Sequence, residues 1–161
     1  MKQGKEKDGL PEKIVVATHR KARHLYEILE AYEAGLSLTG PEVKSLRSGR
    51  ASLDGCFGRA EAGELFLLNF YIPPYRHSSE ASDPRRTRKI LMHRLEIERL
   101  SRRIEAQGLT LVPLEVYFRR GWAKVCLALA RGKRGPDRRE DIKKRVLARE
   151  ARKSFKGRYR G

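Results

Sequence analysis

Alternating apolar and polar positions predict antiparallel strands through the middle of this 161-residue chain. The alternation has the two-residue period of a half-buried strand in residues 24–38, 64–72, 109–118 and 122–130. The composition of 24–38 favours a helix, but its even positions from 26 onward are apolar except for Glu30, so the pattern favours a long strand. The side chains predicted to face a core are Phe66, Leu68, Phe70, Ile72, Val112, Leu114, Val116, Phe118, Val125, Leu127 and Leu129.

Turn residues join these strands into two hairpins. Ala62-Gly63 lies between the strands of the first hairpin, and Arg119-Arg120-Gly121 lies between those of the second. The other segments predicted in this region are a strand at 57–61, a stop at Pro73-Pro74, a polar and basic loop at 75–88 and a short strand at 89–92.

Two helices are predicted between the strands. One covers Pro41–Arg47, where a proline suits the first helical position because the N–H that it lacks would have no partner there. The other covers Arg94–Gln107, whose apolar residues have helical spacing, and Gly108 follows it as a typical stop. Hairpins and short helices together predict a small closed β-barrel with helical decoration over 13–130, after a flexible leader at 1–12.

Residues 131–161 concentrate the positive charge of the chain. They hold 14 Lys or Arg and 4 Asp or Glu, which is +10 of the net charge of +17. With so few apolar residues, this segment cannot bury enough surface to offset the entropy lost when its chain becomes ordered. It therefore needs a polyanion to fold against, and nucleic acid is the abundant polyanion in a cell. A capping box at Asp137 and Glu140 and a thin apolar stripe predict a helix that forms only on RNA. The stripe consists of Ile142, Val146, Ala151 and Phe155. The alternative is a basic tail that only aids solubility.

The sequence contains no recognisable catalytic or metal-binding motif. Its histidines are His19, His24, His77 and His93. His19 and His24 are interpreted as surface or RNA-facing side chains, and Cys56 and Cys126 as reduced thiols. Nothing resembles a secretory signal or reaches the length of a membrane span. We therefore expect a cytoplasmic, non-enzymatic protein without a cofactor or metal. A nuclease whose carboxylates converge in space is the enzymatic alternative.

Basic residues lie beside aromatic residues in two segments, as is typical of proteins that bind unpaired nucleic acid. The segment THRKARHLY places basic side chains and histidines beside Tyr26, which could equally be a core residue. Arg119, Arg120 and Lys124 surround Trp122. Trp122 is either a core residue at the barrel edge, the interpretation favoured slightly, or a platform for base stacking.

Four segments resemble the SmpB family, the small protein B that binds SsrA RNA. They are RKARHLYEILEAYEAGLSLTGPEVKSLRSGRASL, DPRRTRKILMH, GLTLVPLEVYF and LALARGKR, in the expected order between about Lys21 and Arg145. The string AGLSLTGPEVKSLRSG is highly specific by itself. The resemblance implies an antiparallel barrel of the oligonucleotide-binding (OB) type with about three helices, and it implies that 24–38 is mainly strand.

The resemblance also implies a function. Family members bind the tRNA-like part of transfer-messenger RNA (tmRNA, or SsrA RNA) and carry it to ribosomes stalled on messages that lack a stop codon, in the process called trans-translation. They act as adaptors and not as enzymes. The implied partners are tmRNA, the ribosome with its small-subunit rRNA, and elongation factor Tu with GTP, reached indirectly through tmRNA. The alternative is a general RNA-binding or ribosome-assembly module.

Carried over residue by residue, the resemblance implies a tmRNA-binding surface. Its residues are Lys21, Arg23, Glu33, Leu91, His93 and Lys124. Because a carboxylate repels phosphate, Glu33 is expected to accept hydrogen bonds from base or ribose donors or to orient an arginine, with a pairing to a neighbouring lysine as the structural alternative. Leu91 would pack on a base, and His93 would stack or hydrogen bond. The three cations would contact phosphates.

The basic tail resembles the family segment that enters the empty mRNA channel of the ribosome. The residues implied are Gly132, Lys133, Arg134, Asp137, Arg138, Arg139, Lys143, Lys144 and Arg145. Arg138 stands where the family has Lys, which keeps the charge but changes the donor geometry. Pro136 stands where some members have His, so imidazole stacking is not transferred. The tail is expected to be disordered when free and helical on the ribosome.

Overall fold

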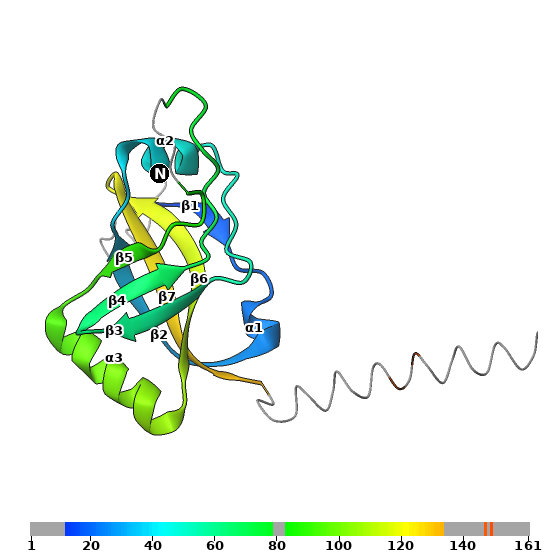
Figure 1. Ribbon diagram of the computed structural model, residues 1–161, viewed down its shortest axis with the longest axis vertical. Helices are drawn as coiled ribbons and strands as arrows, with labels where there is room; N and C mark the ends of the chain where they lie inside the picture. The colour runs from blue at the N-terminus through cyan, green and yellow to red at the C-terminus, as the bar shows by residue number, and fades with distance from the viewer. Residues whose placement is uncertain (1–11, 79–82, 134–146, 148, 150–161) are drawn as a thin grey trace, which may run out of the picture.

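The alternating segments form an antiparallel barrel, seen in a computed structural model that describes residues 12–78, 83–133, 147 and 149 (Figure 1). The strands are β1 (Lys13–Thr18), β2 (Tyr26–Leu36), β3 (Phe57–Glu61), β4 (Glu64–Leu68), β5 (Arg88–Leu91), β6 (Thr110–Arg119) and β7 (Trp122–Gly132). Their order is β1-β6-β3-β4-β5-β2-β7, and β6 also pairs with β7, which closes β2 to β7 into a ring. The predicted closed antiparallel barrel is confirmed, including the long strand within 24–38.

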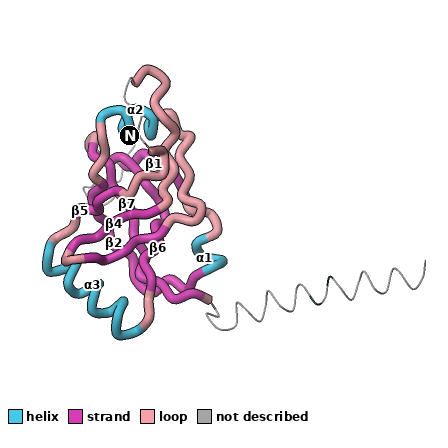
Figure 2. Tube along the Cα trace, viewed as in Figure 1, coloured by secondary structure: helices cyan, strands magenta, loops and turns pink. Residues whose placement is uncertain are grey.

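Three helices decorate the barrel (Figure 2). They are α1 (Ala22–Leu25), α2 (Gly40–Arg47) and α3 (Arg94–Gln107). α2 and α3 lie at opposite ends of the molecule in this view. The predicted bounds of α3 are confirmed, and Gly108 ends it with a φ of 62°. The short α1 was not predicted, because four residues give too little periodicity for a sequence pattern.

A reciprocal cap starts α2. The backbone N–H of Glu42 donates to the Thr39 hydroxyl at 3.3 Å, and the Thr39 N–H donates to Glu42 Oε1 at 2.9 Å. This cap satisfies two backbone donors that the first helical turn would otherwise leave without partners. The helix therefore begins at Gly40, one residue before the predicted start.

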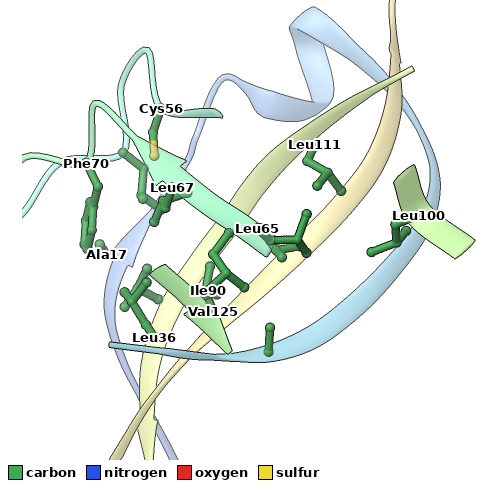
Figure 3. Packing of buried hydrophobic residues seen from close by; sticks show 14 of the residues in the cluster. Ala17, Leu36, Cys56, Leu65, Leu67, Phe70, Ile90, Leu100, Leu111 and Val125 are labelled. Atoms are coloured by element: carbon green, nitrogen blue, oxygen red, sulfur yellow. The ribbon is translucent and has the colours of Figure 1, made fainter. Parts of the chain in front are cut away.

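The core is formed by apolar side chains that point into the barrel from opposite strands. Figure 3 shows Leu65, Leu67, Ile90 and Val125 together in the interior. Leu100, from α3, is also buried in this cluster. In β7, the predicted inward residues Val125, Leu127 and Leu129 are confirmed, because each is fully buried.

The predicted core face of the first hairpin is wrong for part of its length. Leu65 and Leu67 are buried in β4, whereas Phe66 and Leu68 are only partly buried. The strand ends at Leu68, and Asn69 follows it with a φ of 63°. This left-handed residue interrupts the alternation. The inward positions consequently change from odd to even, and the predicted Phe70 and Ile72 are indeed buried.

A similar change of face occurs in β6. The β6–β7 register shifts between Pro113 and Glu115, and Leu114 is the extra residue. A β-bulge of this kind reverses the side-chain alternation on the two sides of it. Val116 and Phe118 point into the main core, as predicted. Val112 does not point into the main core, because it packs in a small separate cluster. Leu114 is only partly buried and packs against that small cluster. Leu111 takes the inward position before the bulge.

Arg88 is a core residue that the sequence pattern placed in a polar loop. The side chain is fully buried at the start of β5. Its Nε donates to Glu42 Oε2 at 2.6 Å, and its other nitrogens donate to the carbonyls of Phe70, Arg86 and Pro84. Arg88 therefore connects α2 to β5 and to the chain that precedes β5.

The buried carboxyl of Glu42 stays ionised because several donors surround it. Burial by itself would raise the pKa of Glu42, but hydrogen bonds from Arg86, the Thr39 N–H and Arg88 lower it below its usual value. Burial lowers the pKa of Arg88, and the hydrogen bond to Glu42 opposes this change. Both groups remain charged at neutral pH, since an arginine pKa starts so high.

Candidate nucleic-acid interface

Four of the six predicted RNA-binding residues meet in one surface hollow. Glu33, Leu91, His93 and Lys124 all line it. Strand register explains the meeting, because Gly35 in β2 lies opposite Leu91 in β5 on one side and Lys124 in β7 on the other. Adjacent strands are about 4.8 Å apart, so the backbones of Leu91 and Lys124 are separated by roughly 10 Å.

Gly35 allows Leu91 to lie close to the floor of this hollow. A Cβ built on Gly35 would be 3.1 Å from the Leu91 Cβ, which is tighter than an ordinary contact. Leu91 is 49% exposed despite its apolar side chain. The glycine therefore keeps an apolar surface open beside the cation of Lys124.

Glu33 holds an arginine in place. Its Oε2 accepts a hydrogen bond from the Tyr117 hydroxyl and another from Arg119 Nη1 at 2.5 Å. The Arg119 guanidinium also lies 5.3 Å from the centre of the Tyr117 ring, within cation–π distance. Burial, followed by the hydrogen bond to Glu33, raises the pKa of Tyr117 well above its usual value. In the structure Glu33 thus takes one of the two roles expected for it, orienting an arginine. The sequence placed Arg119 only among the cations around Trp122 and gave no sign of its pairing with Glu33.

His93 lines the hollow with an exposed side chain. It immediately precedes α3 as the N-cap residue, but its side chain makes no capping hydrogen bond. A capping role would have engaged the ring with the helix backbone. The imidazole is therefore available for stacking or hydrogen bonding.

Lys21 and Arg23 lie at α1 and not in this hollow. Both side chains are exposed. Arg23 lines a second depression together with Glu115 and Cys126. Cys126 is the cross-strand neighbour of both Glu115 and Glu33. The two depressions therefore have lining residues that are paired on adjacent strands, Glu33 in the first and Cys126 in the second.

His19 is buried, so its interpretation as a surface or RNA-facing side chain is wrong. Its Nδ1 lies 3.0 Å from the Pro113 carbonyl, and its backbone N–H donates to the Leu114 carbonyl at 2.8 Å. A carbonyl can only accept, so Nδ1 carries the proton in this contact. His19 fixes the chain before α1 against the bulge in β6. His24 is exposed, as predicted.

Trp122 is 72% exposed, so its interpretation as a core residue is wrong. It lies at the start of β7, directly opposite Arg119. Tyr26 is partly buried and packs against the small cluster that contains Val112. Of the two aromatic residues singled out in the sequence, only Trp122 offers a largely open ring.

The start of the basic tail is connected to α1. Gly132 pairs with Tyr26 at the end of β7. The Lys133 backbone N–H donates to the Leu25 carbonyl at 3.0 Å, and its Nζ donates to the Arg23 carbonyl at 2.9 Å. The other predicted tail residues, Arg134, Asp137, Arg138, Arg139, Lys143, Lys144 and Arg145, lie outside the described residues.

Residues 12–78 and 83–133 offer neither a metal site nor a membrane-spanning helix. No group of three or more His, Cys, Asp or Glu side chains in this part of the chain could hold a metal ion. None of its helices has both the length and the apolar character needed to cross a membrane. Cys56 and Cys126 are both free thiols, and burial raises the pKa of Cys56 to about 12.

A closed antiparallel barrel that presents cations beside exposed Leu91, His93 and Trp122 defines a nucleic-acid-binding protein of the OB type. The family model for SmpB protein matches residues 16–157. The chain belongs to the SmpB family, which confirms the resemblance found in the sequence.

Known relatives agree with this assignment. An SsrA-binding protein of Thermus thermophilus is 54% identical over 136 residues, which cover 83% of this chain and 94% of the relative. One from Nostoc punctiforme is 49% identical over 144 residues, which cover 88% and 93%. A solved structure described as "tmRNA-SmpB: a journey to the center of the bacterial ribosome" is 57% identical with a TM-score of 0.61, covering 73% of this chain and 84% of that one.

Proposed function

We propose that this protein is an adaptor that binds the tRNA-like part of tmRNA and delivers it to stalled ribosomes in trans-translation. Membership of the SmpB family, relatives named SsrA-binding proteins and a structural neighbour described as tmRNA-SmpB support this role. The observation that carries the proposal is the meeting of Glu33, Leu91, His93 and Lys124 in one hollow. These residues come from four different elements or their ends, and only the closed barrel brings them together.

The hollow offers each kind of contact that an unpaired nucleotide uses. Leu91 supplies an apolar surface for a base, His93 supplies a ring with a donor and an acceptor, and Lys124 supplies a phosphate contact. Glu33 does not oppose this binding electrostatically, because Arg119 pairs with its carboxylate. Lys21 and Arg23 extend the cationic surface toward α1.

The basic tail acts as the sensor of an empty mRNA channel. When mRNA fills the channel, a competing polyanion excludes the tail, and when the channel is empty, phosphates of small-subunit rRNA attract its 14 cations. The protein works in the cytoplasm without catalysing a reaction. It meets elongation factor Tu with GTP only through tmRNA.

A gel-shift titration with labelled tmRNA tests the barrel site. Leu91→Ala combined with His93→Ala should weaken binding by about tenfold or more in excess tRNA and rRNA, because an apolar and a ring contact are both lost. Leu95→Ala with His77→Ala is the matched control, since these residues are exposed and do not line the hollow. Equal affinity of the two double variants would remove Leu91 and His93 from the site. Full competition by tRNA would favour a general RNA-binding module.

Ending the chain after Lys133 tests the sensor. This truncation keeps β7 and the contacts of Lys133 with α1, so tmRNA affinity should remain close to that of the full chain. Tagging of stalled products in a reconstituted translation reaction should be lost. Tagging at the full rate would refute the role given to the tail.

A further inference from the structure

The proposed function gives the exposed Trp122 no contact of its own with RNA. It is the single tryptophan of the chain, and 72% of it is accessible to solvent. Large aromatic side chains usually bury most of their surface, so an open tryptophan on a folded strand suggests a partner.

The second hairpin holds Trp122 rigidly. Arg120 and Gly121 form its two-residue turn with φ angles of 52° and 78°. Positive φ at both positions is the geometry that matches the twist of paired strands. Trp122 therefore starts β7 in register with Arg119 and does not sit on a loose loop. A ring in this position can be stacked upon with little loss of conformational entropy.

Trp122 points to the same outer side of the barrel as Lys124. Side chains alternate between the two faces of a strand. Val125 and Ala123 face the core, so Trp122 and Lys124 face outward. Two residues along a strand span about 7 Å. Since Lys124 lines the hollow with Leu91 and His93, Trp122 lies immediately beyond the edge of that hollow.

The charges around Trp122 favour an anionic partner. Arg119 in β6 forms an ion pair with Glu33 in β2, and Lys13 in β1 forms one with Glu115 in β6. Across the part of the chain that the structure describes, Arg120 and Lys124 have no acidic partner within ion-pair distance. A flat aromatic face between two uncompensated cations matches a nucleobase with its flanking phosphates better than it matches an apolar peptide.

We propose that Trp122 stacks on an unpaired base of the tRNA-like part of tmRNA, so that the RNA interface runs from Leu91 past Lys124 to the tip of the second hairpin. This inference rests on the proposed function and adds a further binding residue to it. Arg120 and Lys124 would hold the phosphates on either side of the stacked base.

The emission of Trp122 gives a direct test in the unmodified full-length chain. Titration with the tRNA-like half of tmRNA should quench this emission and protect the ring from acrylamide, with the same midpoint as a gel shift. Binding in the gel shift without quenching or protection would overturn the inference while leaving the proposed function intact. Protection by ribosomes lacking tmRNA, with none from the tRNA-like RNA, would assign Trp122 to rRNA and would also overturn it.

Variants separate stacking from simple apolar contact. Trp122→Ala should weaken tmRNA binding by about 5- to 140-fold, the range for loss of one base–aromatic stack. Trp122→Tyr should keep most of the affinity, whereas Trp122→Leu should behave like the alanine variant. Full affinity of the leucine variant would overturn the stacking assignment. Each variant should unfold at the wild-type temperature, because Trp122 lies outside the core.

Discussion

Replacing Arg88 with methionine should be among the most destabilising single changes in this barrel. The side chain is fully buried and donates to one carboxylate and three backbone carbonyls. Methionine has a similar length and packs well, but it donates nothing. The variant would leave the buried Glu42 carboxylate with weaker compensation and three carbonyls without their present donor.

The expected loss follows from these contacts. Removing one partner of a buried ion pair costs about 3–5 kcal/mol, because the other charge stays in the interior. Here Arg86 and the Thr39 N–H still donate to Glu42, which moves the estimate toward about 3 kcal/mol. The three carbonyls that lose their donor increase the expected loss of stability again. Since a domain of this kind is stable by about 5–15 kcal/mol, the loss would be a large fraction of the total.

Urea unfolding followed by far-ultraviolet circular dichroism measures this change. Tryptophan emission is a poor probe of unfolding here, because Trp122 is already exposed in the folded protein. Arg86→Met is the matched control, since Arg86 pairs with the same carboxylate but is 37% exposed at its side chain and should cost about 1 kcal/mol. A loss below about 1 kcal/mol for Arg88→Met, or equal losses for both variants, would refute the structural role given to Arg88.

Three further predictions concern stability and thiol chemistry. The pKa of Glu42 is lowered on folding, so its ionised form stabilises the protein above about pH 4.5, and this stabilisation is lost as the pH falls further. The difference in unfolding free energy between the wild type and Glu42→Gln should therefore shrink below about pH 4.5. Gly58→Ala should cost about 1–3 kcal/mol in urea unfolding, because its Cβ would lie 2.8 Å from that of Leu111. Unchanged stability would contradict this packing. Cys126 should react with a thiol reagent before Cys56, which is buried and has a pKa raised to about 12.

Periodicity predicted the architecture because most strands here keep one face in the core over several residues. β7 shows this best, since Val125, Leu127 and Leu129 alternate without interruption. The prediction failed where a single backbone irregularity changed the face. The bulge at Leu114 and the left-handed Asn69 each reverse the alternation of buried and exposed side chains. A two-residue repeat of apolar positions in the sequence does not show where such a reversal occurs. Asparagine is enriched in left-handed positions, so Asn69 offered a weak clue.

The candidate site was predictable mainly through the family resemblance. Glu33, Leu91 and Lys124 are far apart in sequence, and only the strand register around Gly35 shows that they meet. The burial of Arg88 had no local signal, because its partner Glu42 is 46 residues away. Basic composition around it resembled a solvated loop, and burial depends on long-range pairing that composition does not contain.

In the proposed interface, the arrangement of charge on the outer face would let a basic protein hold RNA in a defined place. Cations that are free to move attract phosphate from every direction, which gives strong but unselective binding at low salt. Here the acidic residues fix some of the cations, since Glu33 holds Arg119 and Glu115 holds Lys13. Arg120 and Lys124 remain unpaired within the described chain, and they lie beside surfaces suited to bases. In the proposed interface, selectivity would come from the rigid barrel that sets the spacing between these cations and the stacking surfaces, more than from the total charge.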